Sequence, residues 1–336
     1  MFFLKSEDMV RLLFYGLLLI STTTSAQPTA NKPNKRTQKL LAEVSAIIKK
    51  NSIYSASMDW SGMAKEIGSL HWTENDSINY SLVFRFFTVK LREAGDRHSH
   101  FYTKSVSNYV KTYLPVLQPN AQYLDKGIGL IKVPYCSADQ VNGRDFANKI
   151  RREIQRIDTS HKITGWVVDL RHNTGGNMWP MLAGLNALMD DGTVGYFIYP
   201  TSKKTERWIS KNGRIALPVG KVDTYKIKDT KLKIAILIDS MTASSGEMTA
   251  ISFIGLPNVK VFGQPSAGLT TGNSSFKLSD GTTLNLATVY VADRTKKSYL
   301  SVITPDVVVN TNPAETSDIS LNTAKEWLLL PKAIEY

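Results

Sequence analysis

The stretch KIAILIDSMTASSGEMTAISFI, residues 233–254, contains the clearest change of pattern in the chain. Its first six residues are mostly apolar, which predicts a buried strand, and residues 244–254 have a helical pattern. Ser244 would begin this helix, with Glu247 at the spacing of a capping box. A serine between a strand and a helix is either a helix cap or an exposed nucleophile. This stretch alone favours the cap.

Strands and helices alternate on both sides of this stretch. Apolar runs predict strands at residues 127–136, 165–170, 194–200 and 258–263, and amphipathic patterns predict helices at 145–157, 177–189 and 319–330. Alternation of this kind predicts an α/β body with parallel strand pairing. Asp280 and Gly281 form a hairpin signal inside a segment of alternating polarity.

The part of the chain before residue 96 has a helical pattern and lacks the alternation of strands and helices. Residues 27–36 (QPTANKPNKR) are polar and read as a flexible leader, and the pattern from Thr37 to about Gly95 is helical. We therefore predict a small helical N-terminal domain over residues 27–110, including the leader, and an α/β domain over residues 111–336.

Residues 1–26 have the pattern of a signal peptide. Lys5 and Arg11 flank the start of an apolar stretch at residues 12–20, and Thr24 and Ala26 occupy the cleavage-site positions. This predicts export to the periplasm or the outside of the cell, and an uncleaved membrane anchor is the alternative. The single cysteine, Cys136, cannot form an internal disulfide and is expected to be a buried bystander.

Composition limits the possible partners. The 336 residues are 42% hydrophobic, which is enough for a substantial core, and the formal net charge is +12. The basic residues are scattered and aromatic residues do not interleave with them, so no nucleic-acid partner is expected, whereas anionic envelope surfaces could attract the chain. His98 and His100 lack companions at ligand spacing, and we expect no metal and no cofactor.

Two further segments could carry chemistry. AGDRHSHF (residues 94–101) places His98 in a turn after a long helix, and VVDLRHNTGGNM (residues 167–178) places Gly175 and Gly176 between a strand and a helix. Backbone N–H groups of such glycines could face a developing oxyanion. The glycines could equally serve only the left-handed backbone of the turn.

Taken together, these segments resemble peptidase family S41, which includes the tail-specific and C-terminal processing proteases. VVDLRHNTGG is similar to the family's DLR-x-N-x-GG segment, TASSGE to its nucleophile segment, and VFGQPSAG to the strand and turn that follow. LSDGTTLNL and ITPDVVV resemble two later segments in the same order. The resemblance covers roughly residues 128–309 and implies a spiral of strand-strand-helix units like that of crotonase and Clp protease.

Residue by residue, the resemblance implies a catalytic site. Ser244 matches the nucleophile. The backbone N–H groups of Gly176 and Ser245 match the oxyanion hole, and Gly175 supports the turn. His98 matches the base of the tricorn-like branch.

The chain also departs from the family pattern. Leu269 stands where the processing-protease branch has a base lysine, and residues 101–126 leave no room for a PDZ domain. Tyr299 stands where the tricorn-like branch has an acid. Glu247 and Asp96 are then the foremost candidates for the acid that orients His98, with Asp239 a third.

Three functions follow, in decreasing order of support. The first is an exported serine endopeptidase that hydrolyses envelope or extracellular peptides or proteins. The second is a binding protein that keeps the fold, takes a peptide or a hydrophobic small ligand, and has lost efficient catalysis. The third is an acyl-CoA enzyme of crotonase type, which the signal peptide disfavours.

Overall fold

The computed structural model describes residues 29–30, 32–106, 108, 115–137, 142–211, 214–215, 223–310 and 317–331. The predicted signal peptide at residues 1–26 and the predicted domain boundary at residues 110–111 lie outside them. Within the described ranges, no helix is both long and apolar enough to span a bilayer.

The first large sheet has six strands, of which five are parallel. Its order is β15 (Val307–Val308), β11 (Val259–Gly263), β10 (Lys233–Ile238), β6 (Gly165–Asp169), β5 (Ile128–Lys132) and β4 (Asn120–Tyr123). Strand β4 is antiparallel to β5, and the other neighbours pair in parallel. The predicted α/β body with parallel pairing is confirmed.

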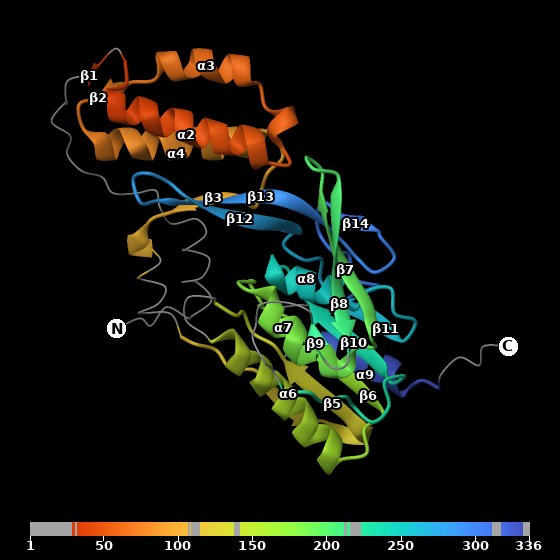
Figure 1. Ribbon diagram of the computed structural model, residues 1–336. Helices are drawn as coiled ribbons and strands as arrows, with labels where there is room; N and C mark the ends of the chain where they lie inside the picture. Colours follow the sequence, from red (N-terminus) through yellow and green to blue (C-terminus); the bar gives the residue numbers. More distant parts are fainter. Residues whose placement is uncertain are drawn as a thin grey trace.

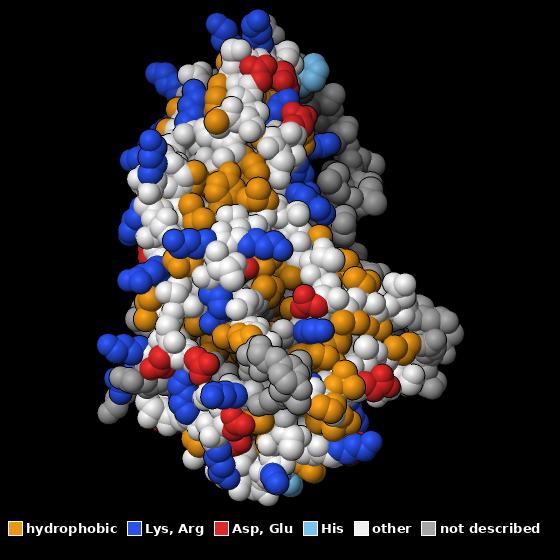
Figure 2. Space-filling view, turned by 90° about the vertical axis from the view of Figure 1, so that its right-hand side faces the viewer, with side chains coloured by type: hydrophobic (Ala, Val, Ile, Leu, Met, Phe, Trp, Pro, Cys, Tyr) orange, Lys and Arg blue, Asp and Glu red, His pale blue; other side chains and the backbone are white. Residues whose placement is uncertain are grey.

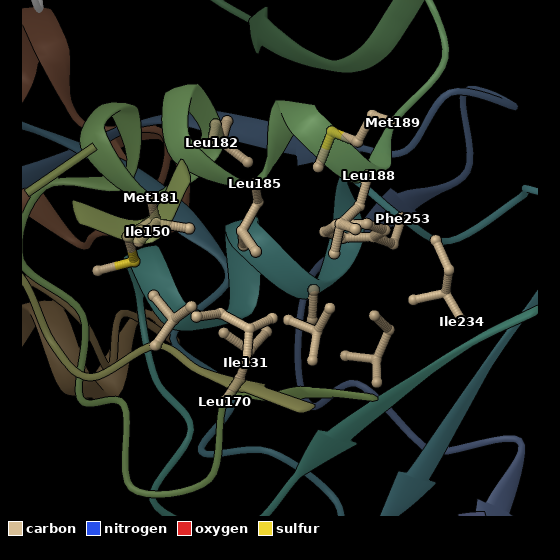
Figure 3. Close-up of a cluster of buried hydrophobic side chains, with 14 of the residues drawn as sticks. Ile131, Ile150, Leu170, Met181, Leu182, Leu185, Leu188, Met189, Ile234 and Phe253 are labelled. Atoms are coloured by element: carbon tan, nitrogen blue, oxygen red, sulfur yellow. The ribbon is translucent and has the colours of Figure 1, made fainter. Parts of the chain in front are cut away.

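Helices cover both faces of this sheet because its central strands are apolar on both sides. Alternate residues such as Val168 and Ile236 pack with α6 (Gly143–Ser160), α7 (Met178–Leu185) and α8 (Ser245–Ile251). Figure 3 shows part of this cluster, in which Leu182 and Leu185 of α7 lie over Ile131 and Leu170. The residues between them, such as Val167 and Leu237, pack with α9 (Ile319–Leu329).

The second large sheet is built around strand β13. Its main order is β12 (Thr271–Lys277), β13 (Thr283–Ala292), β7 (Gly192–Tyr199), β8 (Lys204–Lys211) and β9 (Arg214–Ile215). Strands β3 (His100–Tyr102) and β14 (Ser298–Tyr299) also pair with β13. The predicted hairpin is present between β12 and β13, and Gly281 has the positive φ (+88°) that its turn requires.

Three helices form the N-terminal part: α2 (Lys35–Asn51), α3 (Trp60–Ser69) and α4 (Asp76–Glu93). Each begins at a residue whose side chain accepts a backbone N–H: Asn34, Asp59 and Asn75. Gly95, at φ +98°, ends the α4 segment as predicted. The remaining short elements are β1 (Thr29–Ala30), β2 (Trp72–Thr73), η1 (Ser55–Ser57), η2 (Asp125–Gly127) and η3 (Asn186–Leu188).

These helices lie on the β12–β13 hairpin, at the top of Figure 1. Leu284 and Leu286 of β13 are fully buried and belong to the same hydrophobic cluster as Val44 and Phe87 of the helices. The backbone N–H of Ile53 also donates to Ala287 O at 3.2 Å. The helical part and the second sheet therefore share one hydrophobic core.

The surface charge is dispersed. Figure 2 shows Lys and Arg side chains spread over one face among neutral, apolar and acidic groups, without a single basic field. This pattern agrees with the scattered basic residues of the sequence.

The shared core makes a prediction about stability. Replacing Leu284 by Ala should lower the free energy of unfolding by about 2–5 kcal/mol, because the side chain is 0% exposed and leaves a cavity. Ser275→Ala, on the exposed side of β12, is the matched control and should change it by less than about 0.5 kcal/mol. Urea titration followed by circular dichroism measures both. Separate unfolding of the helices in Leu284→Ala, with the body unchanged, would contradict a shared core.

Candidate active site

Ser244 lies in a tight turn between β10 and α8. Asp239 follows β10, and its carboxylate accepts the backbone N–H groups of Met241 and Thr242 at 3.0 and 2.9 Å. The Thr242 hydroxyl donates to Leu170 O at 3.0 Å, which ties the turn to the end of β6. Ser244 itself has φ 51° and ψ −119°, a conformation that non-glycine residues seldom adopt. Its side chain is partly exposed.

His98 lies in the turn between α4 and β3. The buried Asp96 carboxylate accepts the backbone N–H groups of His98 and Ser99 at 2.9 and 2.8 Å and the Ser99 hydroxyl at 2.5 Å. Ser99 Oγ in turn accepts the backbone N–H of Ala287 in β13 at 2.8 Å. This network holds the His98 backbone against the second sheet.

The two turns bring His98 and Ser244 together. His98 Nε2 lies 3.0 Å from Ser244 Oγ, although the residues are 146 positions apart in the chain. The other ring nitrogen, Nδ1, lies 2.8 Å from Thr271 Oγ1, at the start of β12. The serine hydroxyl and a ring nitrogen are thus at the distance that proton transfer requires.

The His98 ring is held in its neutral form. Burial, reinforced by the nearby His100, lowers the pKa of His98 from its usual 6.5 to about 4. A neutral imidazole at physiological pH can accept a proton from a serine hydroxyl.

The turn that contains Gly175 and Gly176 lies directly against the turn that contains Ser244. Gly175 and Gly176 have φ +108° and +99°, and a Cβ on Gly175 would lie 2.8 Å from Ser244 Cβ. A Cβ on Gly176 would lie 2.2 Å from Cys136 O. Only glycine fits at either position without a shift of the backbone.

Hydrogen bonds fix the orientation of this turn. Asn173, which is fully buried, accepts the Gly175 N–H at 3.0 Å through its side chain, so that N–H is occupied. Gly175 O accepts the Cys136 N–H at 3.1 Å, and Gly176 O accepts the Ser245 hydroxyl at 2.8 Å. The N–H groups of Gly176 and Ser245 therefore remain the candidates for an oxyanion hole, as the sequence predicts, while Gly175 supports the turn.

Glu247 joins the Ser244 turn to the loop that precedes β12. Its carboxylate is fully buried and accepts the backbone N–H groups of Ser244, Gly268 and Leu269 at 2.8, 2.8 and 2.9 Å and the Ser266 hydroxyl at 2.5 Å. Its predicted place as capping partner at the start of α8 is confirmed. Burial raises the pKa of Glu247 to about 6, and these hydrogen bonds oppose the rise.

The candidate acids do not contact the His98 ring. The expectation that Glu247 or Asp96 orients it is corrected, because Nδ1 faces the Thr271 hydroxyl and both carboxylates are bonded to backbone N–H groups. Asp239 pairs with His172, at 2.8 Å. Tyr299, which occupies the expected acid position, donates to Asp293 at 2.9 Å.

Sequence reasoning missed Thr271. It lies two residues after Leu269, in the segment where the processing-protease branch has its base lysine, and a lone threonine at the start of a strand has no distinctive spacing.

The described residues hold no group of three or more His, Cys, Asp or Glu side chains placed to bind a metal ion. Cys136 is buried, and burial raises the pKa of its thiol to about 12. A thiol held protonated in this way is a poor nucleophile at neutral pH.

Comparisons with known proteins point to one family. Residues 127–309 match the model of Peptidase family S41. The chain is 31% identical over 281 residues to the nisin-resistance protein of Lactococcus lactis subsp. lactis, with 82% of each chain covered.

Two solved structures are similar to this chain in fold. A lipoprotein from Streptococcus agalactiae aligns at 27% identity with a TM-score of 0.69, covering 91% of this chain and 98% of that one. The photosystem II D1 C-terminal processing protease aligns with a TM-score of 0.57 at 11% identity, over 86% of this chain and 97% of that one, which is a likeness of fold alone. The family match spans more than half of the chain and the curated relative exceeds 30% identity, so the chain belongs to peptidase family S41.

Proposed function

We propose that this protein is an exported serine endopeptidase with Ser244 as nucleophile and His98 as general base. One observation carries the proposal: Ser244 Oγ and His98 Nε2 lie 3.0 Å apart in a partly buried contact. Membership of a peptidase family supports the reaction class.

The acylation step follows from the positions of these atoms. Ser244 Oγ attacks the carbonyl carbon of the scissile peptide bond while its proton passes to His98 Nε2. The carbonyl oxygen gains the negative charge and takes hydrogen bonds from the N–H groups of Gly176 and Ser245. The C–N bond then breaks, and His98 Nε2–H delivers its proton to the leaving amine.

Deacylation repeats the sequence with water. His98 Nε2 removes a proton from a water molecule, whose oxygen attacks the acyl carbon, and Ser244 Oγ leaves with the proton from Nε2. The products are a carboxylic acid, a free amine and the regenerated serine. No other co-reactant is needed.

The relatives suggest where and on what the enzyme acts. One relative is named for resistance to nisin and another is described as a lipoprotein. We therefore propose an extracytoplasmic location and a peptide substrate, with nisin as the first peptide to assay. The apolar stretch at residues 12–20 supports export.

The first test removes the nucleophile. Ser244→Ala should reduce peptide cleavage by at least about 10⁴-fold, because no other group replaces the Ser244 oxygen. Ser240→Ala changes an exposed serine of the same loop and should leave the rate within about 2-fold. Cleavage is followed by mass spectrometry, and a fluorophosphonate probe should label the wild type and Ser240→Ala but not Ser244→Ala.

Two results would count against this function. Unreduced cleavage by folded Ser244→Ala would remove Ser244 as nucleophile. A wild-type protein that binds peptides but neither cleaves them nor reacts with the probe would support the alternative of a non-catalytic binding protein.

The second test concerns the charge of the base. Because the pKa of His98 is lowered to about 4, the ring should stay neutral as the pH falls from 7 through 6.5 and take up its proton only near pH 4. Histidine NMR signals followed against pH measure this midpoint directly. His100→Ala removes the second cause and should raise the midpoint. A wild-type midpoint near 6.5 would contradict the prediction.

A further inference from the structure

We propose that the Thr271 hydroxyl takes the place of the acid in a serine–histidine–acid triad: it accepts the Nδ1 proton of His98 and so fixes the tautomer and orientation of the base. The proposal rests on the proposed function of His98. Thr271 is a positioning residue, since it acts on the substrate only through the imidazole.

Thr271 is buried, and its side chain contacts both His98 and Asn273. Thr271 is 4% exposed, and its Oγ1 lies 2.8 Å from His98 Nδ1 and 3.4 Å from Asn273 Oδ1. Asn273 Nδ2 donates to the backbone carbonyl of His98 at 3.3 Å. The three residues thus form a ring of contacts that begins and ends at His98.

The direction of each hydrogen bond follows from this ring. A backbone carbonyl can only accept, so it requires the amide NH₂ of Asn273 and turns the Asn273 carbonyl oxygen toward Thr271. That oxygen also only accepts, so the Thr271 hydroxyl donates its single proton to it. Thr271 Oγ1 then faces His98 with lone pairs alone, and Nδ1 must carry the ring proton.

The consequence for the base lies at the other nitrogen. In neutral imidazole one nitrogen carries a proton and the other accepts one. With the proton on Nδ1, Nε2 has a free lone pair toward Ser244 Oγ and can receive the serine proton. If the Thr271 hydroxyl donated to Nδ1 instead, Nε2–H would face Ser244 and proton transfer to that nitrogen would be blocked.

The nearby carboxylates bind other groups, so a hydroxyl is left to accept the hydrogen bond from the His98 ring. Asp96 holds the backbone of the His98 turn, and Glu247 holds the nucleophile turn. A hydroxyl orients the ring but does not offset the charge of an imidazolium. This agrees with a base that burial keeps uncharged at neutral pH.

Two substitutions separate the hydroxyl from the shape of the side chain. Thr271→Val keeps the branched shape and the Thr271 backbone hydrogen bond to His98 and removes only the hydroxyl, and we expect kcat to fall about 10- to 100-fold with KM nearly unchanged. Thr271→Ser keeps the hydroxyl and should retain kcat within about 3-fold. Circular dichroism and thermal unfolding confirm that each variant is folded.

The decisive measurement is the tautomer, which requires no catalysis. Nitrogen-15 NMR of labelled histidine at pH 7 should show His98 protonated at Nδ1 in the wild type, in Ser244→Ala and in Thr271→Ser. In Thr271→Val the population should shift toward the Nε2–H form. His98→Asn identifies the signal among the five histidines.

The outcomes for Thr271 and for the peptidase function are distinguishable. An Nε2–H tautomer in the wild type, an unshifted tautomer in Thr271→Val, or equal losses in Thr271→Val and Thr271→Ser would overturn the Thr271 proposal and leave Ser244 and His98 in place. Peptide cleavage by Ser244→Ala would overturn the proposed function, whatever the tautomer.

Discussion

Strand β13 is the constraint on which the site depends. It pairs with β3 beside His98 and with β12 at Thr271, and its Ala287 N–H donates to Ser99 Oγ in the His98 turn. The same strand contributes Leu284 and Leu286 to the core beneath the N-terminal helices. A hydrogen-bonded ladder has a fixed register, so one strand determines where the base stands relative to the hydroxyl that contacts it. The nucleophile reaches the same point from the other sheet, at the end of β10.

The single carboxylate of Glu247 joins the Ser244 turn, at the end of β10, to the loop that precedes β12. Each of its oxygens accepts two hydrogen bonds, Oε1 from Ser266 and Gly268 and Oε2 from Ser244 and Leu269. A carboxylate suits four donors because it offers acceptors alone, whereas an amide of the same shape would direct a donor at two of them. The loop before β12 and the nucleophile turn are thereby held as one unit, which carries the start of β12 toward the His98 turn.

The sequence predicts much of this fold because many of its elements are strongly patterned. The central strands are continuous apolar runs, α4 ends at a glycine, and the β12–β13 turn contains Asp280-Gly281, so these elements were predictable. Strand β8 was not predictable in this way: half of residues 204–211 are charged, so the segment has no continuous apolar run, although Trp208 is buried at its centre. Strand β3 was not predictable either, because it is three residues long and pairs with residues that lie 181 to 185 positions away in the chain.

The candidate site likewise has a part that the sequence predicts and a part that it does not. The proximity of Ser244 to His98 and the paired glycines followed from family-like segments, but the neighbour of His98 Nδ1 did not. Acidic residues were the first candidates for the partner of His98, because burying a carboxylate costs free energy unless the carboxylate has hydrogen-bond partners. Asp96 and Glu247 do have such partners, which are backbone N–H groups and serine hydroxyls. The distance of 146 residues between Ser244 and His98 also affects biosynthesis. The ribosome releases His98 first, then Ser244, and last strand β13, so the proposed site cannot assemble in the newly made polypeptide until residues 283–292 have emerged and paired.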